Sequence, residues 1–304
     1  MIKKGIWEEK TPYQKLLILT GLVVVCIMVL TFIATVLIQP LFGLNVFSSP
    51  GTMSDLNNES VISAMKFLQV FNAIGMFVLP PLLLAYFCSQ NTTSFLSMNK
   101  IPNGSLFILS ALGMLISLPI ISVLADLNNH LKLPPILSGL EEWMKASEQQ
   151  AAIVTEKFLD IKSIGGLIFT LFMVALLPAF GEELLFRGSI QNLLNQQSKN
   201  IHLAIILSAA IFSALHMQFY GFLPRMMMGI WFGYLMYWSG SIWLPVTAHL
   251  TNNGAAVLMT YFNPESAKNL ESADNIDSIY VVLSVVVFGA ITFLIRKRSL
   301  GDNR

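Results

Sequence analysis

The sequence predicts an all-α integral membrane protein, a polytopic bundle of about eight transmembrane helices. Hydrophobic residues make up 55% of the 304 residues, charged residues make up only 12%, and the mean hydropathy is +0.67. Soluble domains carry about 25% charged residues, so water is not the main solvent of this chain. Several apolar runs are long enough to cross the hydrocarbon core as helices. We expect residues 1–304 to form a single integral membrane domain.

The first apolar run follows several lysines, a pattern that also begins signal peptides. It extends from about Leu16 to Phe42, which is longer than the apolar region of a signal peptide, and no small-residue cleavage site follows it. We therefore expect a retained membrane helix. The candidate spans are 16–39, 64–88, 105–125, 163–180, 201–217, 223–239, 242–262 and 278–296.

Two further segments are predicted to be helical. Residues 181–196 continue the fourth span or break from it near Pro178 and Gly181. Within the loop 126–162, residues 137–158 have the pattern of an amphipathic helix on the outer face. Its expected apolar contacts are Leu140, Trp143, Met144 and Ile153.

The distribution of lysine and arginine predicts the orientation in the membrane. Basic residues precede the first span and follow the last one, so both termini are expected in the cytoplasm, with an even number of spans between them. The loops 43–60 and 263–277 are acidic, as external loops should be. We expect a prokaryotic plasma membrane.

Polar side chains interrupt the apolar runs in the second half of the chain. A charge at the centre of a bilayer costs about 2.5–3.5 kcal/mol on insertion scales. Several such charges would remove much of a net stability of about 5–15 kcal/mol unless they satisfy one another or line a wet cavity. We therefore expect them to converge. They are Glu182, Glu183, Arg187, His216, Arg225, His249, Asn252 and Asn253.

Helical spacing supports this convergence. Glu183 and Arg187 are separated by four residues with the acid first, the better order for an ion pair on one helix. Glu182 lies about 100° further round the helix and is free to face another partner. The same spacing recurs in the pairs Phe212–His216 and His249–Asn253. Taken singly, each group also fits a structural role as an ion pair, a packed histidine or inter-helix hydrogen bonding.

Three motifs lie in order on successive predicted helices: E-E-x-x-x-R at 182–187, F-x-x-x-H at 212–216 and H-x-x-x-N at 249–253. Together they resemble the CPBP family, which includes CAAX prenyl endoproteases and bacterial abortive-infection or bacteriocin-processing membrane proteins. The likeness covers about residues 165–262, the expected catalytic core.

The resemblance implies an intramembrane endopeptidase that acts on a membrane-embedded or lipidated protein or peptide. The implied roles are general base for Glu182 with the help of His216, support of the motif helix for Glu183 and Arg187, and oxyanion stabilisation for His249 and Asn253. The chemistry agrees, because peptide hydrolysis needs a base of near-neutral pKa and donors aimed at the developing oxyanion. No serine or cysteine is placed as a nucleophile, so water is the expected attacking group.

Other interpretations remain open. Glu182, His216 and His249 would be an adequate ligand set for a zinc protease, but the H-E-x-x-H signature is absent, so no cofactor is favoured. A non-catalytic scaffold or chaperone that retained the fold is a second alternative. A proton-coupled transporter is a third, although no inverted repeat is visible. The net charge of +1 indicates no nucleic-acid partner, so membrane lipid and a membrane-associated substrate are the expected partners.

Overall fold

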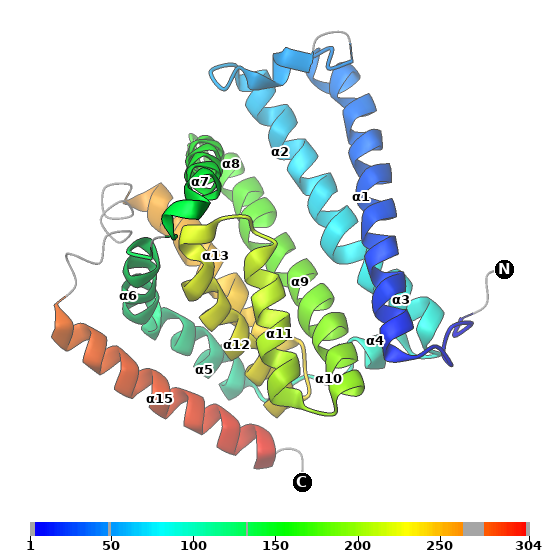
Figure 1. Cartoon of the computed structure of the whole chain (residues 1–304), viewed down its shortest axis with the longest axis vertical. Coiled ribbons are helices and arrows are strands. Elements are labelled where there is room, and N and C mark those ends of the chain that lie inside the picture. The colour runs from blue at the N-terminus through cyan, green and yellow to red at the C-terminus, as the bar shows by residue number, and fades with distance from the viewer. Residues whose placement is uncertain (1–3, 48–49, 132, 264–276, 302–304) are drawn as a thin grey trace.

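The computed structural model describes residues 4–47, 50–131, 133–263 and 277–301, and this part of the chain consists of helices and connecting turns without a β-strand (Figure 1). The predicted all-α class is confirmed.

The first two long helices form a hairpin along one side of the molecule (Figure 1). α1 (Pro12–Phe42) is capped by Thr11, whose hydroxyl accepts a hydrogen bond from the Gln14 N–H. After the 3₁₀ turn η1 (Pro50–Ser54), the chain returns beside α1 as one continuous helix. That helix consists of α2 (Glu59–Ala73), the π-helical turn η2 (Ile74–Val78) and α3 (Leu79–Cys88).

The middle of the chain contains a bent helix pair and a separate long helix. The short α4 (Thr92–Phe95) leads to α5 (Gly104–Ile116) and α6 (Leu118–Asn129), which meet at an angle of 42°. Pro119 accounts for the bend, because it has no N–H to donate and its ring clashes with the carbonyl one turn earlier. The 3₁₀ turn η3 (Pro135–Leu137) then precedes α7 (Ser138–Leu159).

α7 is the helix predicted within the loop 126–162. Among its four expected apolar contacts, the Trp143 ring packs on Phe219 with a centroid separation of 5.4 Å. Met144 lies beside Phe219 in the wall of a small cavity. Leu140 and Ile153 are exposed. The position of this helix at a membrane surface stays a prediction.

The fourth predicted span is part of a much longer helical run, from Ile164 to Ser198. Residues 181–196 continue it rather than break from it. The run consists of α8 (Ile164–Thr170), the π-helical segment η4 (Leu171–Leu176), α9 (Leu177–Glu183), a second π-helical segment η5 (Leu184–Gln191) and α10 (Asn192–Ser198).

The remaining helices complete the bundle and pack against one another. They are α11 (Ile201–Ala214), the 3₁₀ turn η6 (Phe219–Gly221), α12 (Phe222–Ser239), α13 (Trp243–Phe262) and α15 (Ser278–Gly301). α11 packs along α12, α13 lies against α5, α9 and α12, and α15 covers α5, α6 and α12. A buried apolar cluster joins α5, α12, α13 and α15 through Leu106, Met114, Phe232, Leu235, Leu244 and Ile295.

The expected number of eight spans is not confirmed. Within the described residues, four helices are long and apolar enough to cross a membrane, and a fifth is added if α5 and α6 count as one bent span. α11 has 14 residues, so it is about 21 Å long, against a hydrocarbon core of about 30 Å. α12 and α13 are longer, but Arg225 and the polar group His249, Asn252 and Asn253 lower their hydropathy. The predicted acidic loop 263–277 lies almost wholly outside the described residues.

Candidate active site

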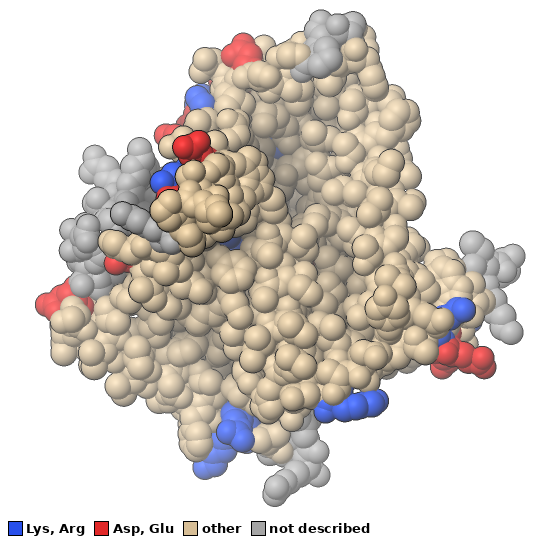
Figure 2. Space-filling view, viewed as in Figure 1, with Lys and Arg blue, Asp and Glu red and all other residues tan. Residues whose placement is uncertain are grey.

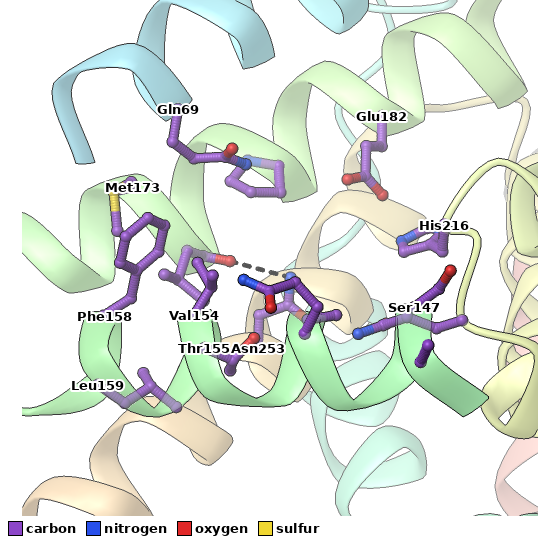
Figure 3. A pocket seen from close by; sticks show the side chains of 16 residues that line it. Gln69, Ser147, Val154, Thr155, Phe158, Leu159, Met173, Glu182, His216 and Asn253 are labelled. Carbon is purple, nitrogen blue, oxygen red and sulfur yellow. Dashed lines mark hydrogen bonds between the residues drawn. The ribbon is translucent and has the colours of Figure 1, made fainter. Parts of the chain in front are cut away.

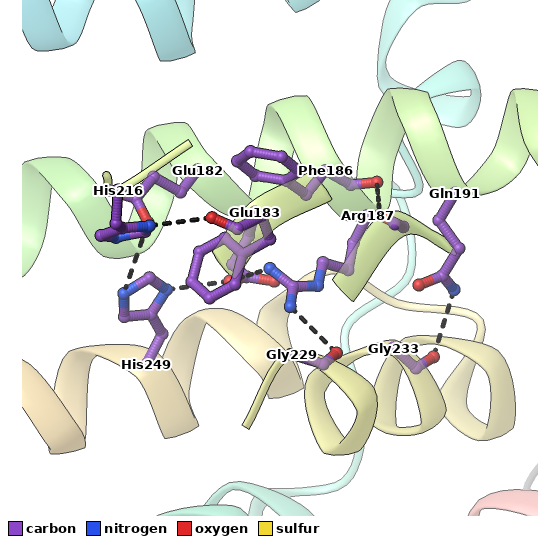
Figure 4. A network of polar contacts seen from close by, with 11 residues as sticks. Glu182, Glu183, Phe186, Arg187, Gln191, His216, Gly229, Gly233 and His249 are labelled. Atoms are coloured by element: carbon purple, nitrogen blue, oxygen red, sulfur yellow. Dashed lines mark hydrogen bonds and ion pairs between the residues drawn. The ribbon is translucent and has the colours of Figure 1, made fainter. Parts of the chain in front are cut away.

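The structure places the side chains of the three motifs around one point between four helical elements (Figure 4). Glu182 and Glu183 end α9, and Arg187 follows in η5. His216 lies just after α11, and His249 projects from α13. α9 and η5 are consecutive, but α11 and α13 are separate helices further along the chain, so the convergence arises from tertiary packing.

Glu183 and Arg187 form a buried ion pair. Arg187 Nη1 donates to Glu183 Oε1 at 2.9 Å, and the side chains are 1% and 0% exposed. Arg187 Nη2 donates to the Gly229 carbonyl at 3.0 Å. The guanidinium carbon lies 4.8 Å and 5.3 Å from the ring centroids of Phe212 and Phe232, a cation–π arrangement. Glu183 therefore neutralises the charge of Arg187, and the rings of Phe212 and Phe232 pack against its guanidinium group.

Two glycines of α12 bring this ion pair into register with the neighbouring helix. Gly229 accepts from Arg187, and Gly233 accepts from Gln191 Nε2 at 3.2 Å. The two donors are four residues apart on one helix and the two acceptors are four residues apart on the other. The two hydrogen bonds therefore lie one helical turn apart along the contact between the helices. A Cβ on Gly233 would lie 2.7 Å from Gln191 Oε1 and 2.8 Å from Ile205, which leaves no room for a side chain. The sequence analysis did not identify Gln191.

His249 connects the two glutamates. Its Nδ1 lies 2.8 Å from Glu183 Oε1, and its Nε2 lies 3.8 Å from Glu182 Oε2. Because an ionised carboxylate only accepts hydrogen bonds, Nδ1 carries a proton and Nε2 faces Glu182. The imidazole stacks on Phe232 at 5.4 Å and 26°. Packing and Glu183 thus fix the orientation of the ring.

Glu182 differs from its neighbour in lining a cavity, although the Oε2 atoms of both carboxylates lack a hydrogen-bond partner among the described residues. It is 7% exposed, and its Oε2 has no hydrogen-bond partner among the described residues. Its side chain lines the cavity described below, together with His216. Two adjacent carboxylates therefore have different environments: Glu183 is neutralised by Arg187, and Glu182 is available to a water or a substrate.

His216 is held by the end of α11. Its Nδ1 lies 2.8 Å from the Phe212 carbonyl oxygen, which lacks a helical partner because the His216 N–H turns to Ser213 instead. A carbonyl only accepts, so Nδ1–H is the donor and the Nε2 lone pair is left for another group. The F-x-x-x-H spacing therefore has a structural cause, since the histidine caps the helix that positions it.

Asn253 anchors α13 to a π-helical segment. Its Nδ2 donates to the Val174 carbonyl in η4 at 3.1 Å, and its Oδ1 accepts from Asn252 at 3.0 Å. The residue also lines the cavity beside Glu182. One N–H of its amide has no acceptor among the described residues and is free for a ligand.

The motif residues open on a cavity of about 920 Å³ (Figure 3). Glu182, His216 and Asn253 line one part of it, Gln69 of α2 faces it from the opposite side, and α7 forms a long wall. A smaller cavity of about 200 Å³ shares these three motif residues and adds His249 and Arg225. The larger volume is in the upper range of ligand pockets, about 300–1,000 Å³.

Arg225 is the remaining charge at this site. Its Nη1 and Nη2 donate to the backbone oxygen and side-chain oxygen of Gln218 at 2.9 Å and 2.6 Å. Gly221 leaves the room for it, because a Cβ there would lie 2.5 Å from Nη2. The sequence identified Arg225 as polar within an apolar run but gave it no role.

Sequence reasoning also missed that α7 contributes to this cavity. Its lining residues are Ala146, Ser147, Gln150, Ala151, Val154, Thr155, Phe158 and Leu159. They recur at helical spacing, and an uncharged stripe of small, polar and apolar residues along one face was the signal that could have revealed them. In the described part of the chain, no group of three or more His, Cys, Asp or Glu side chains is placed to hold a metal ion.

The fold and the site together define an integral membrane protein of helices with an acid and imidazole cluster buried between them. Residues 164–255 match the model of the family described as "Type II CAAX prenyl endopeptidase Rce1-like". This match confirms the resemblance to the CPBP family of intramembrane proteases over that segment.

A curated relative covers more of the chain. The uncharacterized protein YpbD of Bacillus subtilis (strain 168) is 26% identical over 138 residues, which are 44% of this chain and 60% of YpbD. The chain therefore aligns with less than two thirds of that relative. No solved structure matches the chain.

Proposed function

We propose that this protein is a CAAX protease-like intramembrane endopeptidase that hydrolyses a peptide bond in a membrane-associated or lipidated protein or peptide. The observation that carries the proposal is the environment of Glu182. Its Oε2 has no hydrogen bond to the described residues and lies 3.8 Å from His249 Nε2. The Glu182 side chain lines the same cavity as His216. The family match over residues 164–255 supports the same reaction class.

In the proposed mechanism, Glu182 is the general base for a water bound in the cavity. The water oxygen attacks the carbonyl carbon of the scissile peptide bond while Glu182 accepts a proton from it. The Nε2 lone pair of His216 accepts a hydrogen bond from the same water and orients it. Collapse of the tetrahedral intermediate breaks the C–N bond, and Glu182 returns the proton to the leaving amine.

His249 and Asn253 are proposed to stabilise the oxyanion. Since the Nδ1–H of His249 is directed to Glu183, Nε2 can donate only when the ring carries a second proton. That cation would balance the charges of Glu182, Glu183 and Arg187, which are two carboxylates and one guanidinium. Glu183 accepts from both His249 Nδ1 and Arg187, so Glu183 and Arg187 are positioning residues that fix the His249 ring, and the free N–H of Asn253 is the second donor.

We further propose that the reaction proceeds without a metal. The alternative is a zinc enzyme that uses Glu182, His216 and His249 as ligands. Metal analysis of the purified protein, with activity measured before and after chelation, separates the two mechanisms. Retained activity in metal-free protein is the expected result, and stoichiometric zinc whose removal abolishes cleavage would reject it.

Both termini are proposed to be cytoplasmic, in the plasma membrane of a prokaryote. The first end of α1 and the last end of α15 lie in the same lower part of the molecule (Figure 1), where lysine and arginine gather along the edge (Figure 2). Positive charge on one side is typical of the cytoplasmic face. α7, which lines the cavity together with η4 and α9, lies toward the opposite side of the molecule (Figure 1).

The proposed function is tested by comparing the proteomes of cells that carry wild-type protein or the Glu182→Gln variant at equal expression. Membrane or lipidated precursors that accumulate uncleaved in the variant would identify the substrate. An unchanged proteome, with the variant folded and inserted, would favour a non-catalytic scaffold.

A further inference from the structure

We propose that the 920 Å³ cavity beside Glu182 binds an extended peptide segment, and that Gln69 and Gln150 hold its backbone from opposite walls. This inference rests on the proposed function, because it names the conformation and chemistry of the substrate that the site accepts. Both glutamines lie outside residues 164–255. The peptide-binding wall is therefore supplied by parts of the chain that the family match does not include.

Gln69 is an exposed polar residue one third of the way along a mainly apolar helix. It lies ten residues after Glu59, at the start of the continuous Glu59–Cys88 helix, which is about 15 Å along the helix axis. A carboxamide at that depth needs hydrogen-bond partners, since hydrocarbon provides none. No hydrogen bond to Gln69 is present among the described residues, and its side chain faces the cavity (Figure 3).

Gln150 occupies the facing wall. It lines the cavity from α7 with Ser147 and Thr155, and none of these three side chains has a hydrogen-bond partner within the structure's described ranges. Ala146 and Ala151 on the same face are small and leave space between α7 and the motif helix. The cavity thus has side-chain hydrogen-bond donors and acceptors without protein partners on both the α2 wall and the α7 wall, with space between the walls.

A peptide backbone matches these groups. A bond that is to be hydrolysed must leave its helix, which exposes N–H and C=O groups that require partners away from water. A carboxamide has both a donor and an acceptor, so it can pair with a peptide group on both of its polar atoms. A lipid acyl chain would leave Gln69 and Gln150 unsatisfied, and this favours a polypeptide as the occupant.

The test uses photo-crosslinking in cells with full-length Glu182→Gln protein. p-Benzoylphenylalanine is placed at position 150 or, as a matched control, at 149. Gln149 is the same residue type but lines a different cavity, with Lys145 and Glu148. We expect a polypeptide adduct at 150 that contains the precursor accumulating in Glu182→Gln cells, and little at 149. Equal yields at both positions, lipid adducts alone, or no polypeptide adduct would overturn the proposal.

A kinetic comparison provides the second measurement. Loss of one neutral hydrogen bond, about 0.5–1.5 kcal/mol, corresponds to a roughly 2- to 13-fold change. Gln150→Leu should therefore lower kcat/KM for the precursor by this factor through KM, and Gln149→Leu should leave it unchanged. If Glu182→Gln accumulates no precursor, the proposed hydrolysis fails, while the adduct yields at 150 and 149 still decide whether the cavity holds a polypeptide.

Discussion

Glu182→Gln and Glu183→Gln are the same chemical change at adjacent positions, and the structure predicts opposite outcomes. Glu183 neutralises Arg187 at 2.9 Å in a site where both are almost fully buried. Glutamine at 183 would leave the guanidinium without its counter-charge. Removing one partner of a buried ion pair costs about 3–5 kcal/mol. Because the amide oxygen can still accept from Arg187, we expect a loss near the lower limit, about 3 kcal/mol.

Glu182 has no such partner. Its nearest opposite charge would be a protonated His249 at 3.8 Å, and its Oε2 makes no hydrogen bond to the described protein. Glutamine at 182 loses little more than one weak interaction, so the free energy of unfolding should change by about 1 kcal/mol or less. Cleavage should nevertheless fall by about 100- to 10,000-fold, the usual contribution of a general base.

The free energy of unfolding can be measured in detergent micelles by denaturant titration, with the fluorescence of the five tryptophans as the signal. A loss of about 3 kcal/mol is large against a typical stability of about 5–15 kcal/mol. The reasoning would be refuted if both variants lost the same free energy. It would also be refuted if Glu183→Gln were as stable as wild type, or if Glu182→Gln kept its activity.

The other predictions concern catalysis, packing and topology. His216→Gln should lower kcat by about 100-fold or more without changing KM, because only the water loses a partner; an unchanged kcat would contradict its role. Gly233→Ala should destabilise the protein by about 1–3 kcal/mol in thermal unfolding, since a Cβ there meets Gln191 at 2.7 Å. Gly289→Ala, with no atom within 4 Å, is the control and should be neutral or slightly stabilising. In a cysteine-free background, Gln150→Cys should react with an impermeant maleimide in intact cells, and Lys199→Cys only after permeabilisation; the reverse pattern would invert the topology.

Features that depend on helical periodicity alone could be predicted from the sequence. The spacing of Glu183 and Arg187 predicted an ion pair, and the pair is present. The 100° offset of Glu182 predicted a different partner, and Glu182 faces the cavity and His249 instead of Arg187. The helical class and the order of the helices also followed from the apolar runs.

Features that depend on irregular backbone or on close helix contact could not be predicted. The π-helical segments η4 and η5 widen the Ile164–Ser198 run by one residue per turn, and no propensity marks such segments in advance. The Val174 carbonyl that accepts from Asn253 lies in η4. Likewise, the carbonyls of Gly229 and Gly233 accept from side chains, which a sequence pattern of glycines does not specify.

The span count shows a different limit. An apolar run indicates burial, but it does not distinguish burial in lipid from burial among other helices. α11 is apolar and short, and it packs along α12 and η5, so part of its apolar surface faces protein. α7 presents the converse problem: its cavity-facing residues mix polar, small and apolar side chains, so hydrophobic periodicity did not place it beside the site.

A double variant tests whether the buried charges stabilise one another, as the site requires. Arg187→Met alone should cost about 3–5 kcal/mol, because Glu183 would keep its charge at 0% exposure. Combining it with Glu183→Gln removes both charges. The double variant should then lose about 1–3 kcal/mol of unfolding free energy, because the Gly229 carbonyl no longer has a hydrogen-bond donor. We therefore expect the double variant to lose less free energy of unfolding than the sum of the two single losses, by at least about 3 kcal/mol, measured by the same denaturant titration. Additive losses would show that Glu183 and Arg187 act independently, and the charge balance proposed for His249 would lose its basis.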